Sequence, residues 1–514
     1  MVRGMRAQVV IVGGGPVGMV LACELAGYGV RTVVVESQRG VSRWPKATTL
    51  HARTVQCLVR RGYLAGLVSA DQGGGADQGG GSARVSSAFH FAGIAGLAIS
   101  APAAEPEPIL KCAQEELERH FEQRARAAGA RILRGYRVTG VRQGPGGVRV
   151  TAAGPRGRVI CTGGYLVGAD GARSLVREQA GFASRTYPAT VSAMAGDVRV
   201  QGAGVLGAGW HRTPRGWIVA KDVASGVVRL RTLNCEGADL ERRVPLTVEE
   251  LRREVGWIAG RDIAMGEARW LSRFSDFSRL AASYRRGRVL LAGDAAHVHF
   301  PIGGQGLSTG LLDAVNLGWK LALTVRGSAG AGLLDTYDAE RRPAARRVID
   351  SARAQLALMR PGPELDPLRE LFGELLAGQG ESGVLASMVS AQDTVLPGRG
   401  AQGPPWEGRF LHNVGLVTRQ GPADVIGLLG GGRPLLLLFG ERGAGRYAEQ
   451  ARGWASLLRV VHCEPVPQLS CDALLVRPDG YIAWASGAGG PAAALTAYFG
   501  AGAGAGGVLA GAVS

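Results

Sequence analysis

A glycine-rich segment near the N-terminus constrains the fold of this chain more than any other feature. Residues 13–18, Gly-Gly-Gly-Pro-Val-Gly, follow an apolar run at 8–12, and a predicted helix over 16–29 begins within this segment. A second apolar run at 31–36 ends in Glu36. A buried strand, a glycine turn, a helix and another buried strand form the βαβ unit of a parallel sheet, which opens the fold that binds dinucleotides.

The residue types in this unit predict what it holds. Gly13 permits the tight turn, Gly15 lets the backbone approach a pyrophosphate, and Gly18 lets the helix pack on the strand. Pro16 suits the first helical position, and the free amides of that first turn attract negative charge. Glu36 accepts hydrogen bonds from ribose hydroxyls and disfavours a 2′-phosphate, so we expect FAD or NAD rather than NADP. A glycine turn without a ligand is the alternative.

The same glycine spacing occurs twice more, at 202–207 and 502–507. The first of these copies runs into Trp210 without a helix-like pattern, and the second has seven residues after it. Neither context offers a helix N-terminus to a phosphate, so we expect both copies to be structural.

Composition excludes several classes of protein. A chain of 514 residues is expected to form two or three domains, and it contains neither a signal-peptide pattern nor a long apolar run, which predicts a cytoplasmic protein without membrane contact. Its seven cysteines never form C-x-x-C, which argues against a disulfide framework or a zinc site. The net charge of +17 is spread along the chain without a nucleic-acid-binding motif, so we expect no nucleic-acid partner.

Periodicity predicts the domain organisation. Apolar runs at 148–152, 165–167 and 288–292 suggest that the first fold continues after an insertion, and alternation within 185–280 is typical of antiparallel sheet. Long helical patterns follow at 308–326 and 333–359, and a Pro/Gly-rich linker at 397–408 leads into a small α/β pattern. The predicted units are 1–184 and 281–395 for the nucleotide-binding domain, 185–280 for the inserted sheet domain and 396–514 for a C-terminal domain.

Two later acidic motifs narrow the choice of dinucleotide. Asp170 in YLVGADGARSLVR and Asp294 in GRVLLAGDAAHVHFPIGGQGLSTG each follow an apolar strand directly. Either acid alone could cap a helix. With the first glycine loop, in this order, they resemble the class A flavoprotein aromatic monooxygenases, the para-hydroxybenzoate and phenol hydroxylase type, over residues 7–360.

This resemblance implies the fold and the cofactor. It implies an α/β fold: a Rossmann-like FAD-binding domain, an inserted antiparallel-sheet substrate domain and a C-terminal thioredoxin-like domain, which here lacks C-x-x-C and so is expected to be structural. The first loop and Glu36 would bind the ADP half of FAD, Asp294 the ribityl chain, and Asp170 the flavin near the route of the nicotinamide cofactor.

Further segments resemble the subgroup that hydroxylates aromatic polyketides. They are ATTLHARTVQCLVRRG at 47–62, DAVNLGWKLA at 313–322 and YDAERRP at 337–343. Gln114 matches a glutamine near the flavin. Lys46 stands where the family usually has an arginine beside the FAD phosphates, and lysine keeps the charge but not the bidentate fork.

The implied activity is FAD-dependent hydroxylation of a polycyclic aromatic substrate by O2 through a flavin hydroperoxide, with NADPH or NADH as a transient reductant, in antibiotic biosynthesis. Two other activities remain open at this stage: Baeyer–Villiger oxygen insertion on the same fold, and a flavin oxidase or dehydrogenase. The flavin carries this chemistry, so no catalytic side chain or metal is required. We expect a monomer or homodimer.

Several residues are candidates for the surroundings of the flavin and the substrate. Pro301 would stiffen the loop beside the flavin, Gly304 and Gly306 would keep it open, and the amides of Leu307 and Ser308 would face the negative charge of the reduced ring. Arg53 is a candidate phosphate or substrate contact, with an ordinary helix-surface arginine as the alternative. Three tryptophans are candidates to line the substrate site, with a core role as the alternative for each: Trp210, Trp217 and Trp270.

Overall fold

The computed structural model describes residues 3–44, 47–67, 84–201, 206–238, 244–378, 382–398, 406–441, 444–487 and 489–502. Several features of the sequence therefore lie outside the described residues: Lys46, the duplicated glycine segment 71–82, four of the glycines in the repeated motifs (202, 204, 504 and 507), most of the linker 397–408 and the tail 503–514. Gly207 is followed by strand β15 (Gly209–Thr213), so a strand and not a helix continues the second glycine motif.

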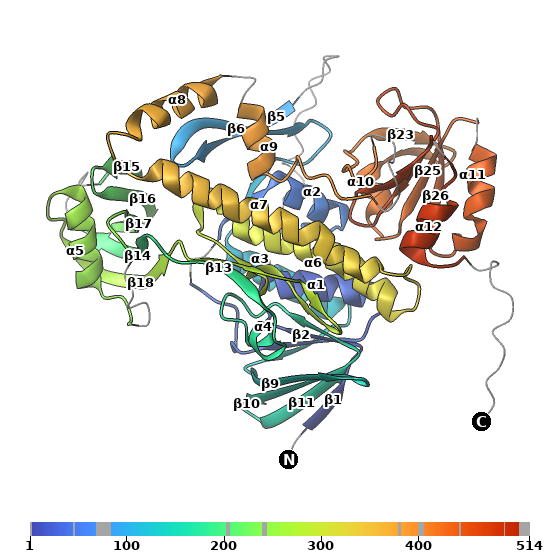
Figure 1. The fold of residues 1–514 in the computed structure, drawn as a ribbon, viewed down its shortest axis with the longest axis horizontal. Coiled ribbons are helices and arrows are strands. Elements are labelled where there is room, and N and C mark those ends of the chain that lie inside the picture. The colour runs from blue at the N-terminus through green and yellow to red at the C-terminus, as the bar shows by residue number, and fades with distance from the viewer. Residues whose placement is uncertain are drawn as a thin grey trace.

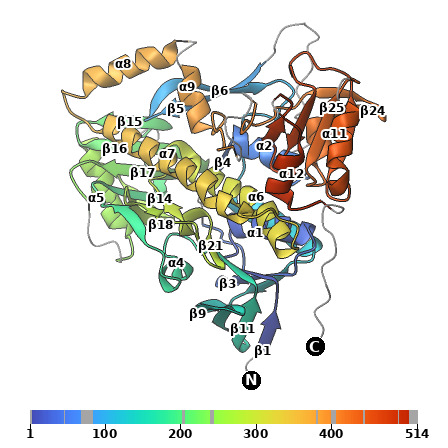
Figure 2. The same ribbon diagram turned by 45° about the vertical axis from the view of Figure 1, so that its right-hand side comes forward.

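A six-stranded sheet organises the N-terminal half, in the order β20-β21-β12-β2-β3-β8. All strands except β20 run parallel, and β2, β12 and β21 are buried along nearly their whole length, as expected for strands covered on both faces. Helices α1, α3 and α6 pack together on this sheet (Figures 1 and 2). The bounds are β2 (Val9–Val12), α1 (Pro16–Gly27), β3 (Thr32–Glu36), α3 (Gln114–Ala127), β8 (Arg131–Arg134), β12 (Tyr165–Gly168), β20 (Arg285–Arg286), β21 (Val289–Leu291) and α6 (Gln305–Val325).

The strand expected at 148–152 exists but does not join the parallel sheet. It is part of β10 (Gly147–Gly154), which lies in a separate sheet of order β1-β11-β10-β9 with β1 (Arg3–Arg6), β9 (Arg137–Gly144) and β11 (Gly157–Gly163). Short hairpins join β10 to both neighbours, which makes it antiparallel to each. Its side chains also alternate between buried and accessible, which suits a sheet with one covered face.

The predicted inserted sheet has five strands in the order β15-β16-β17-β14-β18, covered on one face by α5 (Val248–Ala259). Figure 1 shows it at the end of the molecule opposite the C-terminal segment. A three-stranded sheet of β13 (Ser184–Tyr187), β19 (Ser278–Ala281) and β22 (His297–Val298) joins it to the rest. The strand bounds are β14 (Ser192–Val200), β15 (Gly209–Thr213), β16 (Gly216–Ala224), β17 (Val227–Asn234) and β18 (Met265–Ser275).

The remaining elements enclose the junction of these sheets. Helix α7 (Thr336–Met359) crosses the molecule, and the hairpin β5–β6 packs beside α8 and α9 (Figure 1). A short ladder pairs the strand preceding α2 with the strand preceding α3. The bounds are β4 (Thr49–His51), α2 (Ala52–Arg60), β5 (Arg84–Phe91), β6 (Ile94–Pro102), β7 (Ile109–Lys111), α4 (Leu175–Gln179), α8 (Asp366–Ala377) and α9 (Ser382–Val389).

The C-terminal segment forms a mixed six-stranded sheet of order β24-β23-β26-β25-β27-β28. The expected hairpin at 473–484 is present as β27 and β28. The thioredoxin-like assignment stays a prediction. The bounds are β23 (Gly415–Thr418), β24 (Gly421–Asp424), α10 (Val425–Leu429), β25 (Leu435–Phe439), α11 (Ala444–Ala451), β26 (Arg459–Cys463), β27 (Ala473–Val476), β28 (Ile482–Ala485) and α12 (Ala492–Phe499). Within the described ranges, no helix is long and apolar enough to span a membrane.

Candidate cofactor site and active site

Three segments far apart in the sequence meet at one edge of the parallel sheet. The register places Val12 of β2, Gly168 of β12 and Leu291 of β21 next to one another, so the loops after these strands leave the sheet side by side. Backbone bonds hold the junction: Ala169 N–H donates to Val12 O at 2.7 Å, and Ala292 N–H donates to Gly168 O at 2.9 Å. The carboxyl edge of a doubly wound sheet is where such folds bind ligands.

The glycines of the first loop are needed for different reasons. Gly13 has φ +106°, and a Cβ there would collide with the carbonyl of Ala169, while a Cβ on Gly18 would collide with the carbonyl of Gly13. Gly15 has an extended conformation that any residue adopts, and a Cβ there meets no atom within 4 Å. Since nothing in the protein requires glycine at 15, this position leaves open space above the N-terminus of α1, as a bound pyrophosphate requires.

Glu36 closes the loop from the side. Its Oε2 accepts the Gly14 N–H at 2.6 Å, and its Oε1 accepts the Gln38 N–H at 2.6 Å. These two bonds keep the carboxylate at the end of β3, beside the glycine loop. A carboxylate held there can also accept from ribose hydroxyls.

The two later aspartates differ in their surroundings. Asp170 is engaged locally, because its carboxylate accepts from Ser174 Oγ at 2.5 Å and from Val176 N–H at 3.1 Å. Burial raises the pKa of Asp170, although these hydrogen bonds oppose the shift. Asp294 is exposed, and within the described part of the chain its carboxylate has no hydrogen-bonding partner. Asp294 is therefore free to bind a ligand with hydroxyl groups.

The loop after Asp294 ends in the long helix α6. Gly303 and Gly304 have φ values of +72° and +63°, which place two consecutive residues in the left-handed region before the helix begins at Gln305. Leu307 lies in the first turn, so no carbonyl of the helix lies four residues before it and its amide has no partner within the helix. Ser308 is the first residue whose amide can donate to a carbonyl four residues earlier. The positive end of α6 is thus presented at Pro301 to Leu307.

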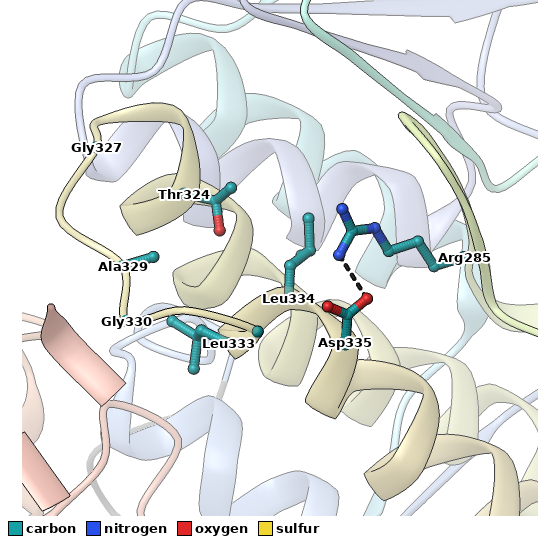
Figure 3. Close-up of a pocket in the computed structure, with 9 residues that line it drawn as sticks. Arg285, Thr324, Gly327, Ala329, Gly330, Leu333, Leu334 and Asp335 are labelled. Carbon is teal, nitrogen blue, oxygen red and sulfur yellow. Dashed lines mark hydrogen bonds and ion pairs between the residues drawn. The ribbon is translucent and has the colours of Figure 1, made fainter. Parts of the chain in front are cut away.

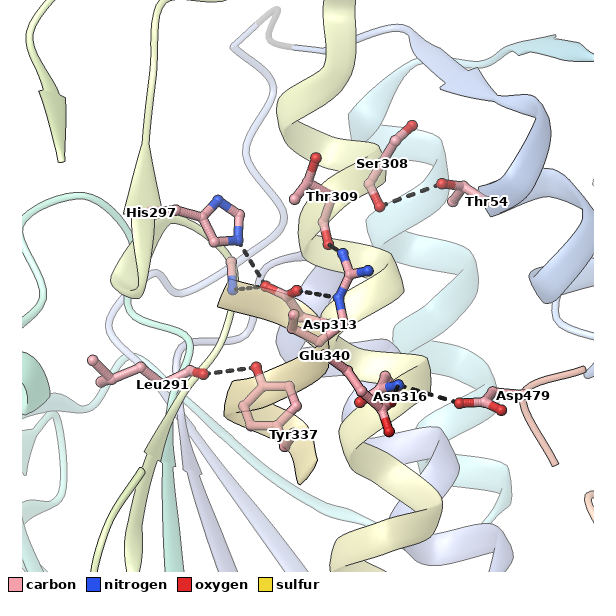
Figure 4. Close-up of polar contacts among 12 residues, drawn as sticks. Thr54, Leu291, His297, Ser308, Thr309, Asp313, Asn316, Tyr337, Glu340 and Asp479 are labelled. Carbon is pink, nitrogen blue, oxygen red and sulfur yellow. Dashed lines mark hydrogen bonds and ion pairs between the residues drawn. The ribbon is translucent and has the colours of Figure 1, made fainter. Parts of the chain in front are cut away.

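His51 fastens this loop to β4. The His51 ring donates from Nε2 to Gly303 O at 2.7 Å, and its backbone N–H donates to Ser308 Oγ at 3.1 Å. The Ser308 carbonyl accepts from Thr54 Oγ1, as drawn in Figure 4. The side chain of Ser308 therefore positions α6 against β4. Sequence reasoning did not single out His51.

The burial of His51 predicts a pH dependence of stability. Burial lowers the pKa of His51 to about 4, so the folded protein keeps this ring neutral while the unfolded chain binds a proton below its ordinary value of 6.5. Stability is therefore expected to fall as pH drops from 6.5 toward 4, by about 3 kcal/mol for a shift of this size. Urea unfolding at a series of pH values measures it, and His51→Asn should flatten the slope; an equal slope in that variant contradicts the assignment.

A buried charge network supports the turn that carries Asp294 (Figure 4). Asp313 of α6 accepts the Gly293 N–H at 3.0 Å, lies 2.7 Å from His297 Nε2 and accepts Arg341 Nε at 2.8 Å. Burial raises the pKa of Asp313, but His297 and Arg341 lower it further, so it stays below its ordinary value. His297 thus has a hydrogen-bonding role within the network, and His299 Nδ1 donates to the Phe300 carbonyl at 2.8 Å.

The three candidate substrate tryptophans lie on one face of the inserted sheet. Trp217 is directly opposite Arg212, Trp210 is opposite Val219, and Trp270 is opposite Asp197. Their shared face is the one that α5 does not cover, since α5 packs on the alternate residues of the same strands. Trp217 is buried and donates from Nε1 to Met359 O at 2.7 Å, so it has a packing role. Trp210 and Trp270 remain accessible candidates.

A series of rings connects this face to the loop of α6. His51 contacts Phe89 edge-on at 5.1 Å, Phe89 stacks on His90 at 4.7 Å, and His90 contacts Trp210 at 4.7 Å between ring centroids. Phe274 of the same sheet face lies 5.6 Å from Phe300. The hairpin β5–β6, which sequence reasoning did not assign, thus places aromatic surface between the cofactor loops and the sheet.

Two other candidates have different surroundings. Gln114 lies beside the loop before β4. Its backbone N–H donates to Ala47 O at 3.1 Å, and its side-chain Oε1 accepts the Ala47 N–H at 3.4 Å. Arg53 is not brought to the glycine loops: it is buried, donates to Gln392 O at 2.9 Å and lies 3.7 Å from the centre of the Phe410 ring. Helix α2 packs on the C-terminal segment, and the guanidinium of Arg53 is buried in that contact.

One pocket lies away from this site. It has a volume of about 250 Å³ and sits where α6 ends and α7 begins, with the Arg285–Asp335 ion pair at 2.6 Å on its wall (Figure 3). It contains no residue of the glycine loops. Its small size and distance along α6 from Gly304 separate it from the cofactor loops.

Comparison with known proteins identifies the family. Residues 6–352 match the family described as FAD binding domain, and residues 404–502 match the family described as aromatic-ring hydroxylase, C-terminal. The first match covers more than half of the chain, including all three loops at the carboxyl edge of the sheet. The cofactor of this family is FAD, which agrees with the open space at Gly15 and the free carboxylate of Asp294.

Relatives resemble the chain over nearly its whole length. A 12-dehydrotetracycline 5-monooxygenase/anhydrotetracycline 6-monooxygenase from Streptomyces rimosus is 38% identical over 96% of this chain and 99% of that protein. A dialkyldecalin synthase from Streptomyces rugosporus is also 38% identical, over 96% of this chain and 99% of that protein. The solved structure of the anhydrotetracycline hydroxylase OxyS from Streptomyces rimosus has a TM-score of 0.86 at 36% identity, over 97% of this chain and 100% of that one. The chain therefore belongs to the family of FAD-dependent aromatic-ring hydroxylases and is a FAD-dependent monooxygenase.

Proposed function

We propose that this monooxygenase hydroxylates a polycyclic aromatic compound of the polyketide type, with NADPH or NADH as its reductant. The observation that carries the proposal is the meeting of three distant loops beside an aromatic face of the inserted sheet. The printed activities of the tetracycline monooxygenase relative and of OxyS support this class of substrate.

Residues of the first loop and of the two later loops would each bind a different part of FAD. The backbone amides at the N-terminus of α1, beside Gly15, would bind the pyrophosphate. Glu36 would bind the adenosine ribose, and Asp294 the ribityl chain. Gln114, beside the loop before β4, stays a candidate neighbour of the flavin, and Asp170 holds the turn that it begins. When bound, FAD supplies the activation of oxygen.

The loop from Pro301 to Leu307 would act through its backbone. The first turn of α6 presents amides without intrahelical partners, and such amides stabilise negative charge that develops on a bound ring. Gly304 and Gly306 leave this turn without side chains that would block it, while Asp313 and His51 hold its position. The protein thus contributes orientation and electrostatic field rather than a catalytic side chain.

The face with Trp210 and Trp270 would bind the flat rings of the substrate and keep water from the reacting atoms. We propose that the domain boundaries lie near residues 184, 280 and 395. The first two are supported by strand pairing, because β13 comes before the inserted sheet in the chain, β19 comes after it, and the two strands pair with each other. The active site then lies between the inserted sheet and the FAD-binding domain.

Isotope labelling tests the activity directly. The yellow holoenzyme is mixed with NADPH, oxygen-18 gas and a panel of polycyclic phenols that includes anhydrotetracycline, and products are weighed by mass spectrometry. We expect one heavy oxygen atom in the product and substrate-stimulated NADPH consumption. Hydrogen peroxide without labelled product indicates an oxidase, a ring-expanded product indicates oxygen insertion, and conversion without NADPH consumption indicates a synthase; each of these contradicts the proposal.

The substrate face makes a separate prediction. Trp210→Ala should raise KM for the aromatic substrate roughly tenfold, because a stacked ring is worth about 1–3 kcal/mol in a bound complex. Trp257→Ala is the matched control, since Trp257 is 42% exposed against 37% for Trp210 but lies on α5. Steady-state kinetics measure both variants. Equal effects in the two variants would place the substrate elsewhere.

A further inference from the structure

The sheet β1-β11-β10-β9 has an outward face that is positively charged. Its inward side chains, such as Met5, Val141, Val150 and Cys161, pack into the main core. Its four strands contain no aspartate or glutamate and six arginines: Arg3, Arg6, Arg137, Arg142, Arg149 and Arg158. Figure 1 shows this sheet at the end of the molecule that carries the N-terminus.

Three of these arginines stand in a row across the strands. Arg142 is directly opposite Arg149, Arg149 is opposite Thr162, and Thr162 is opposite Arg6. Neighbouring strands lie about 4.8 Å apart, so the row is about 14 Å long. All three arginine side chains are exposed, and they lie on the face opposite to the core, since the preceding residue in each strand, Met5, Val141 or Val148, is buried.

No counter-charge for the row is found among the described residues. In the part of the chain that the structure describes, Arg6, Arg142 and Arg149 make no ion pair and no side-chain hydrogen bond. Other surface arginines do find acids, as Arg119 does with Glu115 at 2.7 Å. Like charges directly opposite each other on paired strands destabilise the sheet. A bound anion would remove that repulsion.

The row also lines a hollow. Its volume is about 610 Å³, and its walls are the three arginines, Thr162 and the glycine turn at 144–147. A second hollow of about 450 Å³ shares Arg142 and adds Arg286. Spaces of this size accept small molecules.

This hollow is distinct from the cofactor loops. It is lined by Ala7 and Gly163, which precede strands β2 and β12, whereas Gly13 and Asp170 follow those same strands. The four residues of β2 alone separate the two edges by about 13 Å. A reductant bound at the arginine row would thus face the wrong edge of the sheet to reach a flavin.

We propose that the row Arg142–Arg149–Arg6 binds a small anion with two phosphate groups, such as the pyrophosphate of a nucleotide. The planar guanidinium forks match phosphate oxygens in pairs. Arg142 and Arg149, one strand spacing apart, hold one phosphate between them. The Thr162 hydroxyl, which donates to Met5 O at 3.4 Å in this structure, turns to donate to the next phosphate along the row toward Arg6.

Calorimetric titration of the FAD-loaded enzyme with inorganic pyrophosphate and with ADP tests the site. The variant is Arg142→Ala/Arg149→Ala, and the control is Arg419→Ala/Arg446→Ala, which removes the same charge from exposed positions of the C-terminal segment. We expect binding by the wild type and the control, and Kd at least tenfold higher in the variant, since the variant loses both guanidinium groups that hold one phosphate. Thermal unfolding without ligand should be no lower in the variant, because repulsion has been removed.

Two outcomes of the titration overturn the proposal: absence of binding by the wild type, and equal weakening in the variant and the control. Sedimentation with vesicles of phosphatidylglycerol identifies the source of the phosphate. Phosphatidylglycerol carries one phosphate. If the wild type but not the variant pellets with the vesicles and pyrophosphate does not release it, the row recognises a lipid surface and the proposal of a diphosphate ligand is overturned; release by pyrophosphate supports the proposal.

Discussion

Gly15→Val is expected to yield a folded, colourless protein. A Cβ at position 15 meets no protein atom within 4 Å, and the backbone there has φ −75°, which valine adopts. The only space that the valine fills is the space above the first turn of α1, which FAD requires for its pyrophosphate. We expect the affinity for FAD to fall at least 100-fold, equivalent to about 3 kcal/mol, while the unfolding temperature of the apoprotein changes little.

The matched control is Gly27→Val. Gly27 ends α1, and a Cβ there also meets no atom within 4 Å. This variant should purify yellow, with the FAD content of the wild type. Fluorescence titration of each apoprotein with FAD gives the affinities. Wild-type affinity in Gly15→Val would show that the dinucleotide does not lie over this loop.

Arg477→Leu is expected to destabilise the protein by about 3–5 kcal/mol, the range for removing one partner from a buried charge cluster. Arg477 is 1% exposed and binds both Glu340 of α7, at 2.8 and 2.7 Å, and Asp479, at 3.0 and 2.6 Å. Without it, two buried carboxylates share one neighbouring cation, Lys320, 2.7 Å from Glu340. In the wild type, burial lowers the pKa of Lys320 to about 7, and the charge of Arg477 adds to that shift against the attraction of Glu340. Even a fully charged Lys320 is one cation against two buried carboxylates.

Arg419→Leu provides the comparison, because Arg419 is exposed and surface substitutions usually change stability by less than about 0.5 kcal/mol. Arg477→Lys should fall between the two, since lysine keeps the charge but not the fork that reaches both acids. Urea unfolding of the holoenzyme measures all three. A loss under about 1 kcal/mol for Arg477→Leu would mean that this cluster does not hold the C-terminal segment to α6 and α7.

The sequence predicted the local structure of the cofactor loops well. Glycine spacing, flanking apolar runs and the acid at the end of the second strand depend on neighbours in the chain, and α1, β2 and β3 form within a few residues of their expected bounds. The family and its cofactor were also predicted correctly from motif order. Local patterns suffice there because the chemistry of phosphate binding is contained in one βαβ unit.

Sequence reasoning could not predict contacts between distant segments. The strand at 148–152 was assigned to the wrong sheet, because an apolar run does not reveal its partners. The contact between the Arg53 guanidinium and the Phe410 ring depends on how α2 packs on the C-terminal segment. Asp313, Asn316 and Lys320 recur every three or four residues in the otherwise apolar α6. This spacing is a sequence signal of a buried polar network, because polar side chains on a buried helix face must find hydrogen-bond partners.

The most direct test of the account is a crystal structure of the purified yellow protein. We expect one FAD whose pyrophosphate lies within hydrogen-bonding distance of the amides of Gly15, Val17 and Gly18, with Asp294 on the ribityl chain and the ring system beside Pro301, facing Trp210. A flavin bound elsewhere, or with its phosphates away from Gly15, would contradict the claim that the three loops at the carboxyl edge of the sheet form a single cofactor site.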